Sequence, residues 1–307
     1  MLMRDKASIV EEIKFYTEYA PPFLGVSKDI LEADFAILGV PYDYTSTYRP
    51  GSRFAPDAIR RASMFIEAYS PTIRRDCEHP SISDIGNLTI SNDPRETLGR
   101  IGKVASLLKE LGKVQITIGG EHTITKGCIP PLIGGGGGLL CLDAHLDLRD
   151  EFQGTKLSHA TFMRRIIEEM GPGNAIFIGA RAFSQEELEY ASQIGIKIIS
   201  ARTFNSLNVA TLKEIVQRGI GGRPLYLSID LDVIDPSFAP AVGNPEPYGI
   251  PPSKLIELLA GISMDNEVVG ADLVEVSPEY DDGTTIVLAA KMIVELISMI
   301  RAPRREA

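Results

Sequence analysis

The stretch Leu139-Leu140-Cys141-Leu142-Asp143-Ala144-His145-Leu146-Asp147 joins a short apolar run to three alternating polar residues. The apolar run predicts a buried β-strand over residues 139–142. Alternate residues of an extended strand project to the same side, so Asp143, His145 and Asp147 can converge on one point. The stretch therefore predicts both a buried sheet and a polar site at one end of it.

Apolar runs alternate with amphipathic helical stretches from about Asp34 onward, which predicts an α/β fold with a mainly parallel sheet covered on both faces. Strands are expected at Phe35–Val40, Val114–Ile118, Leu139–Leu142, Ala175–Ile178, Lys197–Ile199, Leu225–Ile229 and Val268–Val274. Helices are expected around Pro56–Arg61 and over Pro94–Leu111, Ala160–Met170 and Thr284–Ile300. No linker of biased composition divides the chain, so residues 1–307 are predicted to form a single domain.

Two more segments place polar residues after predicted strands: Gly119-Gly120-Glu121-His122 and Ser228-Ile229-Asp230-Leu231-Asp232. Open α/β sheets bind ligands beyond the carboxyl ends of their strands. Carboxylates gathered there would repel one another and be costly to desolvate unless cations neutralised them. Imidazole and carboxylate ligands together suit paired Mn²⁺ better than a structural zinc ion. The alternative is a set of turn carboxylates that never meet, since aspartate is common where strands become turns.

The composition limits the possible partners and location. The formal net charge is −10 and the pI is about 5.0, with scattered Lys and Arg, which argues against nucleic-acid binding and favours small cationic substrates. No stretch has the apolar length of a membrane span, and charged residues near the N-terminus argue against a signal peptide. Cys77, Cys128 and Cys141 are widely spaced, as in a reducing compartment, so a cytoplasmic protein is predicted. For Cys141, a small buried hydrophobe is favoured over a metal ligand.

In this order, the motifs Gly-Gly-Glu-His, Asp-Ala-His-x-Asp and Ser-Ile-Asp-x-Asp resemble those of the ureohydrolases. This family of arginases, agmatinases and relatives hydrolyses guanidinium groups to urea and an amine. The similarity runs from Gly39-Val40-Pro41 to Glu275-Val276-Ser277-Pro278. It implies a three-layer α/β/α sandwich with a central, mainly parallel eight-stranded sheet, one strand more than the pattern predicts. It also implies a homo-oligomer, either a trimer or a hexamer.

The resemblance further implies two Mn²⁺ ions per chain. Their ligands would be His122, Asp143, Asp147 and Asp230 for one ion, and His145, Asp143, Asp230 and Asp232 for the other. Asp143 and Asp230 would lie between the ions, because neighbouring cations repel unless anions separate them. Asp147 would also orient the attacking water.

Three other residues receive roles from the resemblance. His159 would carry the proton that the leaving amine needs, as an imidazole can near neutral pH; the alternative is a surface histidine. Glu275 would pair with the substrate guanidinium; the alternative is an exposed turn glutamate, and Asp272 is its competitor on the same strand. Asn244 stands where relatives carry threonine and can still donate and accept hydrogen bonds to the substrate. His79 has no ligand spacing and receives no role.

The loop Leu148–Lys156 is the expected reader of the substrate's far end. It carries Asp150 and Glu151, whose charges suit an ammonium and would repel an α-carboxylate. This loop and its neighbours look most like those of archaeal-type agmatinases, which implies hydrolysis of agmatine to putrescine and urea. N1-aminopropylagmatine, guanidinobutyrate and arginine are alternatives, because Arg149 or Lys156 could instead receive a carboxylate. A non-catalytic regulatory homologue is the other class, but it would have lost metal ligands, and none is lost here.

Overall fold

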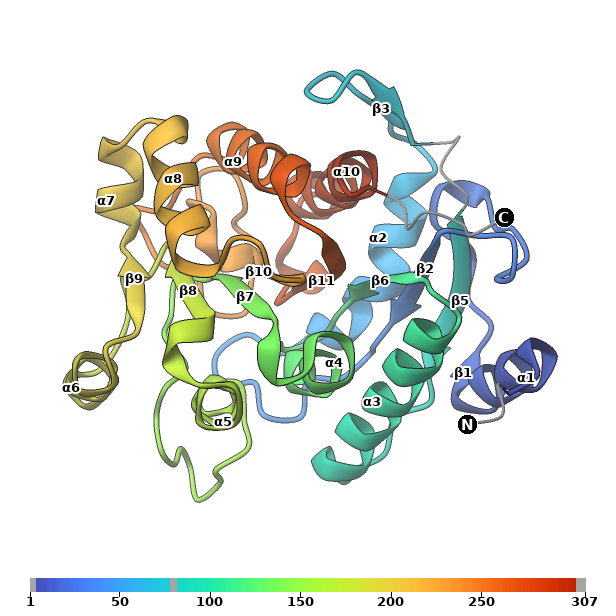
Figure 1. The fold of residues 1–307 in the computed structure, drawn as a ribbon, viewed down its shortest axis with the longest axis horizontal. Helices are drawn as coiled ribbons and strands as arrows, with labels where there is room; N and C mark the ends of the chain where they lie inside the picture. Colours follow the sequence, from blue (N-terminus) through green and yellow to red (C-terminus); the bar gives the residue numbers. More distant parts are fainter. Residues whose placement is uncertain (1–3, 78–81, 302–307) are drawn as a thin grey trace.

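The computed structural model describes residues 4–77 and 82–301 and is built around one large sheet (Figure 1). Across these residues the sheet has nine strands in the order β1-β5-β2-β6-β11-β10-β7-β8-β9. Within the same ranges, eight strands run parallel and the short β1 pairs antiparallel with β5. The strands are β1 (Thr17–Glu18), β2 (Phe35–Gly39), β5 (Ile82–Leu88), β6 (Val114–Ile118), β7 (Gly138–Leu142), β8 (Ala175–Ile178), β9 (Lys197–Ile199), β10 (Leu225–Asp230) and β11 (Val268–Val274).

Helices cover both faces of the sheet (Figure 1). One face carries α1 (Lys6–Tyr16), α3 (Pro94–Glu110), α4 (Thr125–Ile133), α5 (Phe162–Met170) and α6 (Gln185–Ile194). The other face carries α2 (Ala55–Ser63), α7 (Ala201–Ser206), α8 (Val209–Ile220), α9 (Pro252–Asp265) and α10 (Thr284–Met299). The three-layer α/β/α sandwich that the resemblance implied is confirmed.

Strand alternation supplies a hydrophobic core to each face. In β2, Phe35 and Ile37 pack with the α2 and α10 side, whereas Ala36 and Leu38 pack with the α1 and α3 side. All five residues of β2 are buried. A strand covered on both faces reads as a continuous apolar run, which is why these strands could be located in the sequence.

The seven predicted strands are confirmed, each within one residue at either end. The missing eighth parallel strand is β5, beside β2 near one edge of the sheet. Its sequence contains Asp84, Gly86 and Asn87, which hide the strand pattern. These polar groups serve packing, because the buried guanidinium of Arg60 donates to both carboxylate oxygens of Asp84 at 2.8 and 2.9 Å.

The predicted helices are confirmed as α2, α3, α5 and α10. Helix α5 begins at Phe162 instead of residue 160, so His159 lies in the turn before it. A separate hairpin, β3 (Tyr69–Ser70) with β4 (Arg75–Asp76), was not expected. Among the described residues, no helix combines the length and apolar character of a membrane span. His79 lies outside the described residues.

Candidate active site

Four neighbouring strands, β6, β11, β10 and β7, bring polar residues to one edge of the sheet. His122 follows β6 and Asp143 follows β7. Asp230 ends β10 and Glu275 follows β11. Because these strands are parallel, their carboxyl ends coincide, and residues far apart in the chain share one site.

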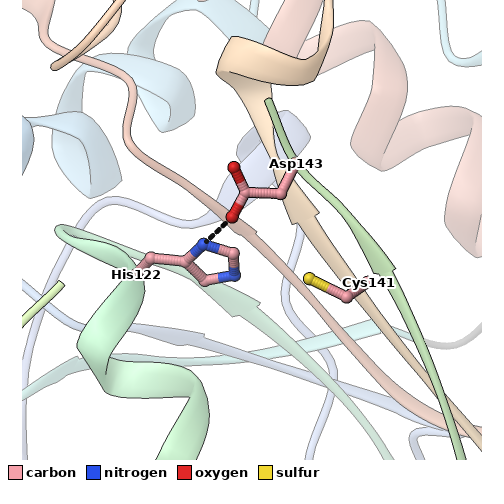
Figure 2. Close-up of side chains that lie close together, drawn as sticks. All are labelled: His122, Cys141 and Asp143. Atoms are coloured by element: carbon pink, nitrogen blue, oxygen red, sulfur yellow. Dashed lines mark ion pairs between the residues drawn. The ribbon is translucent and has the colours of Figure 1, made fainter. Parts of the chain in front are cut away.

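His122 is buried, and Figure 2 shows the carboxylate of Asp143 beside its ring. Its Nδ1 lies 2.9 Å from Oδ2 of Asp143, 3.2 Å from Oδ2 of Asp230 and 3.8 Å from Oδ2 of Asp147. This nitrogen nevertheless forms no hydrogen bond of good geometry with any described residue. Donor atoms that converge in this way fit ligands of one divalent cation, whose neighbouring oxygen and nitrogen ligands stand about 3 Å apart.

The carboxylates around His122 favour a positive charge at this point. Burial opposes protonation of His122, but Asp143 and Asp230 raise its pKa well above the ordinary 6.5. Burial, and then repulsion from Asp143, raises the pKa of Asp147 well above its usual value. A bound cation would relieve both effects, because it replaces the proton and neutralises the crowded carboxylates.

Asp143 divides its two oxygens between two imidazoles. While Oδ2 faces His122, Oδ1 lies 3.5 Å from Nδ1 of His145. The same His145 nitrogen lies 2.9 Å from Oδ2 of Asp232. His145 also lines the open cavity. The donor atoms therefore form two adjacent groups with Asp143 between them, which fits a pair of cations.

A hydrogen-bond chain behind His122 fixes its ring. Ser228 Oγ donates to Asp272 Oδ1 at 2.8 Å and lies 2.9 Å from His122 Nε2. Since the Ser228 proton is directed at Asp272, Oγ accepts from His122 Nε2. In the neutral ring, which a bound cation would require, Nδ1 then offers its lone pair on the side of Asp143. Thr125 and Tyr226 also donate to Asp272, at 2.8 and 2.9 Å. Asp272 is therefore a buried support, and not a rival of Glu275 at the cavity.

Two residues of the site hold unusual backbone conformations. Asp147 has a backbone φ of 53° and Glu275 a φ of 66°. Both values lie in the left-handed region, which residues other than glycine rarely adopt. Glu275 Oε1 accepts from the backbone N–H of His122 at 2.7 Å. Its Oε2 would lie 2.7 Å from a Cβ at position 243, so the glycine there makes room for the carboxylate. Burial raises the pKa of Glu275 to about 8.

His159 is held by a loop that the sequence motifs did not include. Thr45 Oγ1 donates to the buried carboxylate of Glu121 at 2.6 Å. It therefore accepts from the backbone N–H of His159 at 3.0 Å and from Nδ1 at 3.2 Å. This arrangement leaves Nε2 of His159 as the acceptor, 3.3 Å from Thr47 Oγ1 in the cavity lining. Burial, and then the nearby His145, lowers the pKa of His159 to about 4.

These groups open into a cavity of about 330 Å³. Its described lining residues are Thr47, His145, Asp147, Arg149, Phe152, His159, Ala160, Ala182, Phe183, Ser184, Glu187, Asp230, Asp232, Asn244, Glu246 and Glu275. His122 and Asp143 are buried behind this lining. The structure thus gathers the residues proposed for metal binding, proton transfer and guanidinium binding at one cavity.

Asp150 and Glu151 are not among the described residues that line the cavity. Asp150 instead accepts from Lys156 at 2.9 Å and from Arg165 at 2.7 Å. The hydrogen bond from Lys156, followed by that from Arg165, lowers the pKa of Asp150 to about 2. Glu151 is exposed. The positions of these two carboxylates do not support the expected contact with the substrate's far end.

Cys141 lies behind the cluster, with Sγ within 4.8 Å of donor atoms of His122 and Asp143. Figure 2 shows Asp143 at one nitrogen of the imidazole and Cys141 on the side of the other. Burial, and then the charge of Asp143, raises the pKa of the Cys141 thiol well above its usual range. A neutral buried thiol agrees with the interpretation of Cys141 as a small hydrophobe.

Sequence reasoning missed Thr45, Arg181 and Glu246. Thr45 and Arg181 belong to no motif, and only the fold shows what they contact. Glu246 lies two residues after Asn244, so its place in that loop was the available signal.

The sequence profile of the arginase family matches residues 33–298. An agmatinase of Bacillus anthracis is 36% identical over 276 residues, which cover 87% of this chain and 91% of the relative. An N(1)-aminopropylagmatine ureohydrolase of Thermococcus kodakarensis is 34% identical over 265 residues, with coverage of 85% and 89%. The crystal structure of the agmatine ureohydrolase of Thermoplasma volcanium superposes with a TM-score of 0.85 at 35% identity, and the match covers 94% of this chain and 97% of that one.

Proposed function

The chain belongs to the arginase family and is a hydrolase of the arginase and agmatinase type, and we propose that it hydrolyses agmatine to putrescine and urea with two bound Mn²⁺ ions. The observation that carries the proposal is the division of the Asp143 oxygens between His122 and His145 beside a cavity that also contains Glu275. That arrangement supports the proposal of a two-ion site with a place for a guanidinium beside it.

The residues present fit the two ions. His122, Asp143, Asp147 and Asp230 would hold one ion, and His145, Asp143, Asp230 and Asp232 the other. When bound, the pair lowers the pKa of a water molecule and so supplies a nucleophile near neutral pH. Asp147 would accept a hydrogen bond from that water and direct its lone pair at the substrate.

Glu275 and Asn244 would orient the guanidinium. A buried carboxylate gives a guanidinium charge-assisted hydrogen bonds. Glu275 is itself fixed by the N–H of His122, so the substrate's reacting carbon would be held in constant relation to the histidine cluster. Asn244, in the cavity lining, offers a donor and an acceptor to the remaining guanidinium nitrogens.

His159 would complete the cleavage. Its Nε2 is the acceptor nitrogen of the ring and faces Thr47 in the cavity lining, because Nδ1–H donates to Thr45. A proton taken up at Nε2 can pass to the amine nitrogen as the carbon–nitrogen bond breaks, which releases putrescine and leaves urea. The lowered pKa of His159 favours release of that proton over its retention.

Similarity to the family supports the proposals on the alternative substrate, the location and the oligomeric state. A relative that acts on N(1)-aminopropylagmatine, at 34% identity, makes an N-extended agmatine the second candidate substrate. We also propose that residues 1–307 act as one catalytic domain in a cytoplasmic homo-oligomer, a trimer or a hexamer.

A substrate panel tests the proposed function. The protein is loaded with Mn²⁺, and urea release is measured with agmatine, N1-aminopropylagmatine, 4-guanidinobutyrate and arginine. The highest kcat/KM is expected for agmatine. A highest value for arginine or 4-guanidinobutyrate would overturn the substrate assignment. No urea from any of the four, with both ions bound, would indicate the non-catalytic homologue.

A further inference from the structure

The acidic residues that line the cavity are not equivalent. Asp147, Asp230, Asp232 and Glu275 belong to the histidine cluster at the cavity floor. Two further glutamates, Glu187 and Glu246, line the cavity outside that cluster. A cationic group at the far end of a substrate would need one of these two, because the floor carboxylates are committed to the reacting end.

The carboxylate of Glu187 already has hydrogen-bond partners within the protein. Its Oε1 accepts from the backbone N–H of Leu148 at 3.1 Å. Its Oε2 accepts from the N–H and the hydroxyl of Ser184, at 2.8 and 2.9 Å, and lies 3.5 Å from Nε of Arg149. Glu187 is also 3% exposed, so it serves as a structural anchor for the start of α6.

Glu246 differs from Glu187 in that its carboxylate forms no hydrogen bond or ion pair with any residue in the described ranges. The charge of Glu246 acts on Arg181, but the guanidinium of Arg181 donates hydrogen bonds only to backbone carbonyls among the described residues. These are the carbonyls of Gly179, Asp232, Val233, Ile234, Glu246 and Pro247. Glu246 therefore lines the cavity, and its carboxylate has no hydrogen-bond partner among the described residues, which leaves it available to bind a ligand.

Arg181 also fixes where Glu246 stands. One of its terminal nitrogens donates to the carbonyls of Asp232 at 2.7 Å and of Glu246 at 2.8 Å. This fork ties the loop of Glu246 to the backbone of a residue in the histidine cluster. The loop is tied again where Gly249 N–H donates to Asp235 at 2.8 Å. A rigid link between floor and rim can select substrates by their length.

The remaining wall suits an uncharged chain. Phe152 and Phe183 line it with aromatic surface. The charge of Arg149 is compensated by Glu187 and by the ring of Phe152, which lies 5.1 Å from the guanidinium carbon. A substrate with a guanidinium at one end, methylenes in the middle and a cation at the other end matches a cavity with carboxylates at its floor, aromatic side chains along its wall and Glu246 at its rim.

We propose that Glu246 determines the substrate's far end: its carboxylate binds the distal ammonium of a diamine-type guanidino substrate. The inference rests on the proposed guanidino hydrolase function and deepens it. It assigns to Glu246 the task that the sequence suggested for Asp150 and Glu151.

The test compares substrates that differ only at the far end: agmatine, 1-butylguanidine and 4-guanidinobutyrate, which end in a cation, a neutral methyl group and an anion. With the Mn²⁺-loaded protein, Glu246→Gln should lower kcat/KM for agmatine by about 10- to 100-fold, mainly through KM. It should leave 1-butylguanidine within about twofold, because no charge pair is lost. Glu246→Lys should make 4-guanidinobutyrate a better substrate than agmatine.

Glu189→Gln is the matched control, because it removes the same charge from an exposed site on α6 outside the cavity lining. Asp150→Asn and Glu151→Gln test the rival assignment. A selective loss for agmatine in either of those two variants, or an equal loss for agmatine and 1-butylguanidine in Glu246→Gln, would overturn the role of Glu246. Absence of urea release by the unaltered protein from all three substrates would instead overturn the function on which the inference depends.

Discussion

The floor and the rim of the cavity are built from different parts of the chain. Floor residues such as Asp143 and Asp230 stand at strand ends and are nearly buried, so the sheet fixes their positions. Rim residues such as Phe152 and Glu246 stand on loops, whose course depends on contacts with other loops. The comparison agrees with the proposal that residues fixed by the sheet carry out the reaction and that loop residues select the substrate.

The largest expected effect on activity and metal content is for substitutions of the floor residues. Asp143→Asn and Asp230→Asn each remove a charge that would separate two cations. We expect both to lose bound metal and to lower activity by far more than about 100-fold, the upper range for indirect metal contacts. Metal analysis after dialysis and a urea assay check this. Normal metal content with near-normal turnover would contradict the assignment of the floor.

His159→Asn should have the next largest effect, because His159 lines the cavity but lies outside the proposed set of metal ligands. We expect a rate lower by about 10²- to 10⁴-fold, the usual contribution of a positioned proton carrier, with metal content unchanged. Turnover and metal analysis on the same sample measure both quantities. Loss of metal would show that His159 is a ligand and that the proposed division between floor and rim is wrong.

The pH dependence of stability gives His159→Asn a second readout. Burial lowers the pKa of His159 from 6.5 to about 4 in the folded state. The unfolded chain therefore binds a proton first, and this group's contribution, present above pH 6.5, is lost as the pH falls toward 4. The variant should lose less stability between pH 7 and pH 5 than the unaltered protein, as measured by thermal unfolding. An identical pH dependence would contradict the buried, neutral imidazole.

The smallest of these effects concerns the support behind the floor. Ser228→Ala removes the acceptor of His122 Nε2 and one donor to Asp272. We expect metal affinity to fall by about 10- to 100-fold, the range for groups that orient metal-binding histidines. Titration of Mn²⁺ into the metal-free protein measures it. Ser263→Ala is the matched control, because Ser263 is buried and its hydroxyl has no hydrogen-bond partner among the described residues.

The sequence predicted the strands and the floor of the cavity better than its rim. Most of the seven strands were located because they are short apolar runs buried on both faces, and the positions of His122, Asp143 and Asp230 followed from the strand ends. β5 was missed because Asp84 interrupts its pattern to bind a buried arginine from α2. No local pattern reports such a distant partner.

The rim was harder to predict for a related reason. Asp150 has the charge expected of an ammonium receptor, but it is paired with Lys156 and Arg165 and is not among the described residues that line the cavity. Thr45 reaches His159 from a loop 114 residues earlier in the chain. Loop composition gave the kind of charge present, whereas the direction of each side chain depends on partners that only the folded chain brings together.

The position of β11 determines when the sheet can be completed during synthesis of the chain. β11 is the last strand in the chain, yet it lies in the middle of the sheet, between β6 and β10. Until the ribosome has released it, His122 beside β6 and Asp230 on β10 belong to two halves that no strand joins. Binding of the proposed ions is therefore expected only after β11 has emerged, and a nascent chain that ends before residue 268 exposes the edges of β6 and β10 to wrong pairing.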